Sequence, residues 1–436
     1  MLRLTLAAML FLGIAAPSLA ATPPSRPGVD APELAHLGQL GVGVRTLEFI
    51  DRENPDGRSL TATGGPAPAG ERHLTVQLWY PAQVAAGSAA TTYSATLPSE
   101  PPAPPARFSV AGIAVRDAKA AGRAYPLVIV SHGYSNAAVA LSWLTENLAS
   151  KGYVVAAIEH ADPPITDRSG YPKVLLRRPL DIAFVARELH RTLGDMLAPD
   201  RVVLVGYSMG GYGVLTAGGA TLDSTGPISK FLPEAVLKGY ARGGAKAAAM
   251  RVEGVRAVVA LAPAGGGTLL AWGAEGLLGL RAPLLLIAGD DDRTVDYRGG
   301  ARAFFDGATN AKRYLLTFRN GGHAIGLDPV PDEMRERLWD QDWFEDPVWR
   351  KDRIIAINLH MITAFLDRYV KDDASRAAYL EVPVVDAQAG RWPAPGPAHY
   401  GDYSPGTAPI TVWKGFQDRH AAGVQLEERD AAGAAH

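Results

Sequence analysis

Short apolar runs alternate with amphipathic stretches through the middle of the chain. Apolar runs of strand length occupy residues 126–130, 153–158, 201–205, 255–261 and 283–288, and a further strand is expected at 313–318. A helical pattern passes through Trp143, Leu144 and Leu148, and a second covers 180–193. Strands that are apolar on both faces and alternate with helices predict a mostly parallel sheet with helices on both faces. Ligands of such sheets bind at the carboxyl ends of the strands.

The flanking segments follow other patterns. Residues 42–50 and 73–80 alternate between apolar and polar positions, which is typical of half-buried strands. A glycine-interrupted insert at 222–250 separates two predicted strands, and it is either a lid or additional packing. We expect a linker at 21–39, one α/β domain at 40–380, and an irregular Pro- and Gly-rich C-terminal tail at 381–436 that packs on the core.

The first twenty residues have the pattern of a secretory signal peptide. Arg3 precedes an apolar run over residues 4–16, Pro17 ends the run, and Ser18-Leu19-Ala20 provides small side chains for cleavage after Ala20. This predicts a secreted or periplasmic protein, and a buried N-terminal helix is the alternative interpretation. No other stretch reaches the length of a membrane span, so no stable membrane span is expected.

Composition excludes several classes of partner and chemistry. The 43 Lys and Arg residues nearly balance the 45 Asp and Glu residues, and the formal net charge is −2. This balance gives no general electrostatic basis for binding nucleic acid. Because the chain has no cysteine, it has no disulfide, thiolate zinc site or cysteine nucleophile.

The candidate nucleophile is Ser208. It lies in Gly206-Tyr207-Ser208-Met209-Gly210, directly after the strand RVVLV and before a helical continuation. A Gly-x-Ser-x-Gly sequence in this context predicts a tight turn that holds the serine hydroxyl at the top of the sheet. A Gly-Ser turn in a glycine-rich protein is the simpler alternative, since the pattern alone is weak.

A base and an acid are expected later in the chain than the serine. Strand 283–288 is followed by Asp290-Asp291-Asp292, and strand 313–318 by Asn320-Gly321-Gly322-His323. Three adjacent carboxylates cannot all be buried, so we expect one of them to point inward and the others to be solvated. Ser208, Asp292 and His323 then follow the chain order of the α/β-hydrolase triad.

Main-chain amides are the expected oxyanion hole. The loop Ser131-His132-Gly133-Tyr134 follows an earlier strand, where such folds place the second donor. We assign the N–H groups of Tyr134 and Met209 to the oxyanion hole and His132 to support of the loop.

Three further segments have alternative interpretations. Glu159-His160-Ala161-Asp162 is a metal-site fragment or, more plainly, a structural or substrate-edge element. Gly265-Gly266-Gly267 is expected to be a rim loop, because no phosphate-binding Gly-x-x-x-x-Gly-Lys pattern occurs. Trp339, Trp343 and Phe344 either overhang the site or anchor their segment on the core.

Together these motifs resemble the α/β-hydrolase superfamily, near the dienelactone-hydrolase-like and platelet-activating-factor-acetylhydrolase-like bacterial serine esterases. The resemblance covers residues 40 to about 372 and rests on VGVRTLEFID, VQLWYPA, PLVIVSHGYSN, ASKGYVVAAIEH, VGYSMGGYG, AGDDDRTV and NGGHAIG. It implies the α/β-hydrolase fold, with Ser208 as nucleophile, His323 as base and Asp292 as acid. It also implies Tyr134 and Met209 as oxyanion donors.

Two positions depart from proteins that the chain resembles. Animal acetylhydrolases of this type carry their acid at the end of the strand before the one that Asp292 follows, whereas this chain has Ala260-Leu261-Ala262-Pro263 there, so Asp292 must serve. Similar secreted polyester hydrolases carry a tryptophan where this chain has Ala264.

The resulting prediction is a serine hydrolase that cleaves a small-molecule or lipid-like carboxylic ester through an acyl-serine intermediate. No cofactor or metal is expected. A serine peptidase or amidase with the same triad and a non-catalytic binding protein of hydrolase fold are the alternatives. The identity of the ester and the oligomeric state are left open.

Overall fold

The central strands bury their side chains in two different cores. The computed structural model describes residues 27–52, 71–167, 170–389, 413–417 and 420–433. In strand β7 (Tyr125–Ser131), Val128 and Val130 pack in one core, and Leu127 and Ile129 pack in the other. Because neither face meets water, these strands are apolar throughout rather than alternating.

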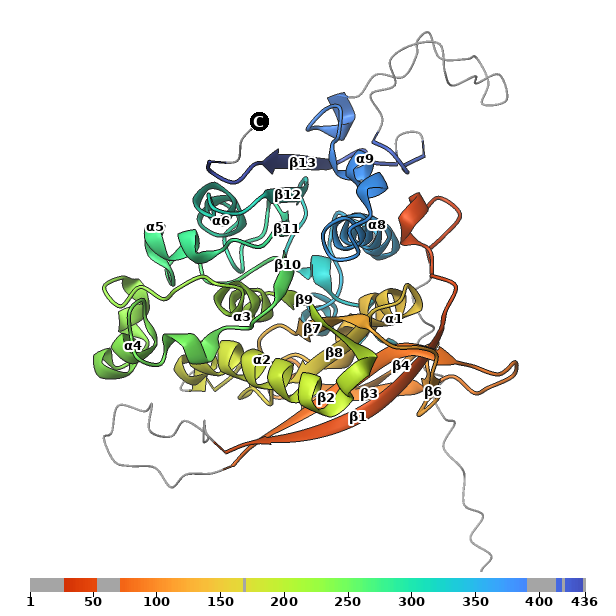
Figure 1. The fold of residues 1–436 in the computed structure, drawn as a ribbon, viewed down its shortest axis with the longest axis horizontal. Coiled ribbons are helices and arrows are strands. Elements are labelled where there is room, and N and C mark those ends of the chain that lie inside the picture. The colour runs from red at the N-terminus through yellow and green to blue at the C-terminus, as the bar shows by residue number, and fades with distance from the viewer. Residues whose placement is uncertain (1–26, 53–70, 168–169, 390–412, 418–419, 434–436) are drawn as a thin grey trace, which may run out of the picture.

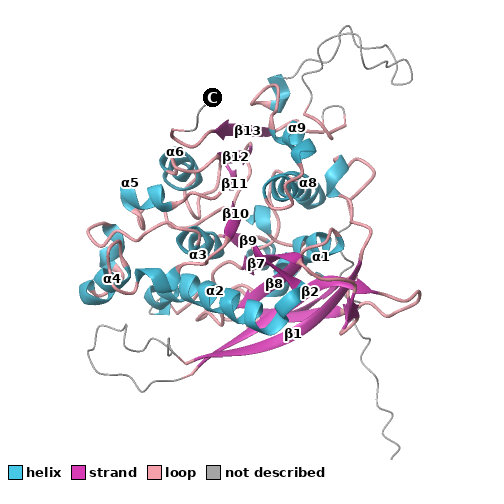
Figure 2. Cartoon of the chain, viewed as in Figure 1, coloured by secondary structure: helices cyan, strands magenta, loops and turns pink. Residues whose placement is uncertain are grey.

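In the described residues the sheet has eleven strands, and the strands at its centre are parallel. Figures 1 and 2 show this sheet passing between the helices of the two faces. Its order is β13-β12-β11-β10-β9-β7-β8-β2-β1-β5, and β6 pairs with β2. The six strands from β12 to β8 in that order are parallel, and β2 and β13 join them antiparallel. Apart from β7, the strands of this sheet are β1 Gly41–Asp51, β2 Arg72–Gln83, β5 Val115–Arg116, β6 Lys119–Ala120, β8 Val154–Glu159, β9 Leu197–Tyr207, β10 Val255–Leu261, β11 Leu284–Gly289, β12 Arg313–Phe318 and β13 Val424–Arg429. Strands β3 Thr92–Leu97 and β4 Ala106–Ala111 form a separate hairpin.

Helices cover both faces of the sheet, as Figure 1 shows. One core contains side chains of α1 (Ser142–Ser150) and α8 (Lys351–Tyr369), and the other contains those of α2, α3 and α6. The remaining helices are α2 Tyr171–Leu193, α3 Met209–Ala217, α4 Glu234–Tyr240, α5 Gly273–Gly276, α6 Ala303–Gly307, α7 Leu338–Gln341 and α9 Ala377–Leu380. The mostly parallel sheet with helices on both faces confirms the predicted fold class.

Helix α2 begins at Tyr171, nine residues before the predicted start at Leu180, and continues through Pro179. A proline inside a helix has no N–H to donate to the carbonyl four residues earlier, which here belongs to Leu175. The buried Tyr212 hydroxyl donates to that carbonyl at 2.8 Å instead. A tertiary hydrogen bond therefore satisfies the Leu175 carbonyl that Pro179 leaves unpaired. The helix can thus continue through Pro179, although a proline at this place in a sequence favours a helix that begins after it.

The insert and the tail both contribute to the fold. In the insert, Ile228, Leu232 and Leu237 are buried in the core that contains α2. In the tail, β13 pairs with β12 over six residues and forms the edge of the sheet. The tail is thus less irregular than expected, because its described C-terminal part completes the sheet.

The predicted signal peptide at 1–20 lies outside the described residues. Among the helices that the structure describes, none has the length and apolar character needed to cross a bilayer.

Candidate active site

Ser208 lies in a strained turn between β9 and α3. Its backbone has φ 54° and ψ −115°, a conformation that non-glycine residues rarely adopt. The flanking glycines allow the close approach that this turn requires. A Cβ on Gly210 would lie 1.9 Å from the Ser131 carbonyl oxygen, and one on Gly206 would lie 2.2 Å from the Gly210 carbonyl oxygen. The Gly-x-Ser-x-Gly pattern is therefore required by contact distances at both glycines.

Ser208, His323 and Asp292 form one hydrogen-bonded line. His323 Nε2 lies 3.0 Å from Ser208 Oγ, and His323 Nδ1 lies 2.7 Å from Asp292 Oδ2. The side chain of Asp292 is fully buried, whereas that of His323 is 21% exposed. The line thus runs from a buried carboxylate through a partly exposed imidazole to the serine.

The three adjacent aspartates have different surroundings, as the sequence predicts. Asp292 points inward, and its Oδ1 accepts the main-chain N–H groups of Thr294 and Val295 at 2.9 and 3.2 Å. Asp290 and Asp291 are exposed and face arginines. Only Asp292 reaches the imidazole.

Side chains from other elements hold the loop that carries His323. Asp346 accepts the Gly322 N–H at 2.6 Å, and Asn358 donates to the Ile325 carbonyl at 2.8 Å. Lys351 donates its ammonium group to the Ala324 carbonyl. Burial lowers the pKa of Lys351 to about 8. No local sequence pattern identifies these three residues, because each is more than twenty residues from its partner in sequence.

Two main-chain amides face the same space as Ser208. Met209 opens α3, and the first amides of a helix have no acceptor within it. Gly133 lies against the serine, since a Cβ built on it would be 3.5 Å from Ser208 Cβ. In the hydrogen-bond network of the described residues, neither the Tyr134 nor the Met209 N–H has a protein acceptor. Both residues line the cavity above Ser208, so the predicted donors are available there.

The cavity at the serine has a volume of about 750 Å³ and aromatic walls. Tyr134, Tyr171, Trp339 and Trp343 line it, together with the glycine loop at 265–267. The two tryptophan rings contact edge to face, with centroids 5.5 Å apart. Phe344 does not reach the cavity, and packs instead in the core against Phe108.

A second Ser-His-Asp arrangement is buried in the fold. Ser131 Oγ is 2.8 Å from His160 Nε2, and His160 Nδ1 is 3.0 Å from Asp181 Oδ2. All three residues are at most 1% exposed, and none lines the cavity. A hydroxyl without access to substrate cannot act as a nucleophile, so this arrangement is structural.

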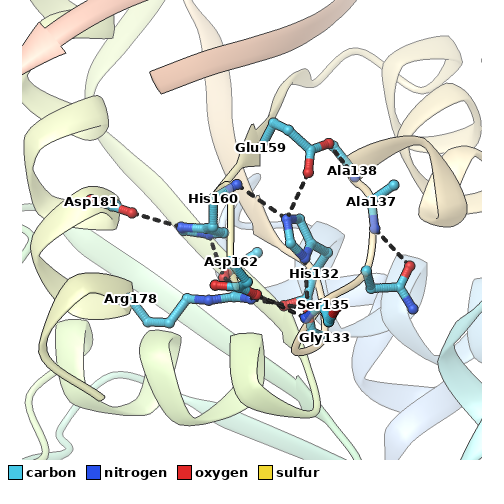
Figure 3. A network of polar contacts seen from close by, with 12 residues as sticks. His132, Gly133, Ser135, Ala137, Ala138, Glu159, His160, Asp162, Arg178 and Asp181 are labelled. Atoms are coloured by element: carbon cyan, nitrogen blue, oxygen red, sulfur yellow. Dashed lines mark hydrogen bonds and ion pairs between the residues drawn. The ribbon is translucent and has the colours of Figure 1, made fainter. Parts of the chain in front are cut away.

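The acidic residues of segment 159–162 accept main-chain amides of a neighbouring loop, which agrees with the structural interpretation of this segment rather than the metal-site one. Glu159 accepts the Ala138 N–H and Asp162 accepts the Ser135 N–H, each at 3.0 Å (Figure 3). Within the described ranges, no three His, Asp or Glu side chains gather as a metal-binding group.

The sheet and the placement of this site at the carboxyl ends of its strands are those of the α/β-hydrolase fold. A family model described as PET hydrolase-like matches residues 110–229. Among solved structures, the chain is similar to a ferulic acid esterase from Streptomyces cinnamoneus, with 21% identity and a TM-score of 0.52 over 81% of this chain and 94% of that chain. No curated relative matches in sequence. The structural similarity confirms the expected α/β-hydrolase fold. The family-model match agrees with the resemblance that the sequence motifs carry.

Proposed function

We propose that the protein is a serine hydrolase of carboxylic esters in which Ser208, His323 and Asp292 are the catalytic residues. The observation that carries this proposal is the continuous hydrogen-bonded line from Asp292 through His323 to Ser208 at the floor of an open cavity. The similarity to PET hydrolase-like proteins and to a ferulic acid esterase supports ester chemistry.

The proposed reaction has two halves. Ser208 Oγ attacks the ester carbonyl while His323 Nε2 takes its proton, and Asp292 holds the imidazole in the required tautomer. The Tyr134 and Met209 N–H groups donate to the tetrahedral oxyanion. His323 then gives the proton to the departing alcohol, and a water molecule hydrolyses the acyl-serine by the same steps in reverse order.

The cavity supports an ester with a bulky apolar or aromatic group. Its walls at Tyr134, Tyr171, Trp339 and Trp343 present ring surfaces, and aromatic side chains bind such groups through apolar burial and edge-to-face contact. A volume of about 750 Å³ exceeds what an acetyl group needs, so small acetate esters should be accepted but bound weakly.

Purified protein tested on p-nitrophenyl acetate, a p-nitrophenyl ester of an aromatic acid, and the anilide of the same acid would decide among the alternatives. We expect ester hydrolysis that Ser208→Ala abolishes, with little anilide hydrolysis. Faster hydrolysis of the anilide would indicate an amidase. Absence of turnover together with absence of labelling by a fluorophosphonate would indicate a binding protein.

We also propose that the protein is exported, on the pattern of residues 1–20 alone. Expression of the full chain in a bacterium, followed by mass measurement of the periplasmic or extracellular product, should give a chain that begins at Ala21. A cytoplasmic product that retains Met1 would contradict export.

A further inference from the structure

A buried arginine contacts the segment 131–134, called the oxyanion loop below because it carries the predicted oxyanion donor Tyr134. Arg178, on α2, is 0% exposed, and its two terminal nitrogens donate to acceptors on three consecutive residues, which are the last residue of β7 and the two residues that follow it (Figure 3). These acceptors are Ser131 Oγ at 3.2 Å, the His132 carbonyl, and the Gly133 carbonyl at 2.9 Å. The same guanidinium group forms an ion pair with Asp162. A buried charge with this many partners is unusual, and all its main-chain contacts are to one turn.

The contact to Gly133 determines where an amide points. The Gly133 carbonyl and the Tyr134 N–H belong to one planar trans peptide, so they point in opposite directions. Two donors hold the carbonyl, Arg178 at 2.9 Å and His132 Nδ1 at 2.7 Å. With the carbonyl held on the buried side, the Tyr134 N–H must face the cavity.

We propose that Arg178 is a positioning residue for catalysis, which orients and polarises the Gly133–Tyr134 peptide so that the Tyr134 N–H binds the oxyanion. This inference rests on the proposed esterase function. Orientation follows from the shared peptide plane. Polarisation follows because a cation that binds the carbonyl oxygen draws electrons from the amide and strengthens N–H donation at its other end.

Asp162 supports the same loop from its other end. Its Oδ2 accepts the Ser135 N–H at 3.0 Å and also pairs with Arg178. Ser135 has φ 52°, a conformation that non-glycine residues adopt only when the surroundings enforce it. Arg178 and Asp162 together therefore fix the residues on both sides of Tyr134.

The buried Ser131–His160–Asp181 arrangement gives Arg178 an acceptor. Because Ser131 Oγ accepts from Arg178, its own proton points to His160 Nε2, and His160 Nδ1–H donates to Asp181. Burial, and then the nearby Arg178 charge, holds the pKa of His160 well below its usual value. The imidazole therefore stays neutral and adds no positive charge beside the arginine.

The test compares Arg178→Lys with Arg313→Lys. Lysine keeps the charge of residue 178 but cannot reach several acceptors at once. Arg313 is a matched control, since it is also buried and donates to main-chain carbonyls, at Phe305, Ala311 and Asp430. Arg313 is the first residue of β12, whereas the serine and the oxyanion loop follow the carboxyl ends of parallel strands. Arg313 therefore lies at the opposite edge of the sheet from the candidate site. Asp162→Asn is a second variant in case Arg178→Lys does not fold.

Three measurements on folded protein separate positioning from general stability. For Arg178→Lys we expect kcat to fall about 10- to 100-fold with KM within twofold, because a misdirected donor loses much of the roughly 100- to 1,000-fold effect of an oxyanion-hole group. Binding of an aryl trifluoromethyl ketone, which forms a tetrahedral oxyanion with Ser208, should weaken by a similar factor. The midpoint of the pH–rate profile should not move. Asp162→Asn should show smaller changes in the same direction, and Arg313→Lys should lower the melting temperature only.

Two results would overturn the proposal. One is a folded Arg178→Lys, or Asp162→Asn in its place, with kcat and ketone affinity within twofold of the wild type. The other is a loss of kcat with unchanged ketone affinity. Wild-type ester turnover that is lost in Ser208→Ala tests the proposed function separately, and ketone binding can be followed by fluorine NMR without any turnover.

Discussion

Tyr212 donates its hydroxyl to the carbonyl of Leu175, the acceptor that Pro179 leaves without a helical partner. Tyr212 is on α3, the helix that begins directly after the candidate nucleophile, and its ring stacks on Trp272 with centroids 5.4 Å apart. The side chain of Tyr212 thus connects α3, which follows Ser208, to α2, which carries Arg178.

Tyr212→Phe should therefore destabilise the protein by about 1–3 kcal/mol, because it leaves a buried carbonyl without a donor. In a Pro179→Ala background the helix can supply its own N–H, so the same exchange should cost less than about 1 kcal/mol. Urea unfolding of the wild type, the two single variants and the double variant measures the free energy of unfolding that each exchange costs. Equal costs in both backgrounds would show that the hydroxyl does not compensate for the proline.

Asp292→Asn should reduce kcat for the ester by about 10³- to 10⁴-fold, because an amide permits the wrong imidazole tautomer while keeping the side-chain shape. Asp291→Asn is the matched control. Its carboxylate is exposed and pairs with Arg293 on the surface, so kcat should stay within twofold. Steady-state kinetics with one ester measures both variants, and similar losses in the two would contradict the assignment of the acid.

Trp343→Ala should raise KM for an aromatic-acid ester about tenfold and leave KM for the acetate within twofold. The reason is that loss of about 1.4 kcal/mol of ring contact corresponds to a factor of ten, and acetate does not fill the aromatic wall. Leu338→Ala controls for disturbance of the segment, since Leu338 is 73% exposed and does not line the cavity. Equal changes with both esters would mean that Trp343 supports the fold rather than the substrate.

Asp328 should make stability depend on pH. Burial raises its pKa from the ordinary 3.8 to about 7, against the opposing hydrogen bonds from Ser142 and the Trp143 N–H. The folded state therefore binds this proton more readily than the unfolded state. Its stabilising effect is complete below about pH 4 and is lost as the pH rises to 7.

The free energy of unfolding of the wild type, relative to that of Asp328→Asn, should fall by on the order of a few kcal/mol between pH 4.5 and 7.5. Denaturant titrations at four pH values in this range measure the difference. Parallel curves for the two proteins would show that Asp328 does not titrate in this window.

The chain order of the motifs, together with the resemblance that they carry, predicts the fold and the line of three residues. Ser208, Asp292 and His323 each follow a strand that is apolar on both faces, and parallel strands place their carboxyl ends at one edge. The candidate site was thus predictable because local patterns identify the strands and the topology brings their ends together.

The supporting residues were not predictable in the same way. Arg178, Lys351 and Asn358 act on main-chain groups that are distant in sequence, and no local pattern names the partner. A signal for Arg178 does exist, since it interrupts an apolar face between Leu175 and Ile182 at helical spacing. The early start of α2 is unpredictable from local sequence for a similar reason, because the hydrogen bond that compensates for Pro179 comes from Tyr212 on another helix.

The pairing of β13 with β12 has a consequence for the newly made chain. More than a hundred residues separate the two strands, so during synthesis the open side of β12 emerges from the ribosome long before its cover exists. An uncovered parallel edge is a template for aggregation with other chains. A nascent or clipped chain that lacks residues 424–429 should therefore depend on chaperones to stay in solution, and the complete chain should not.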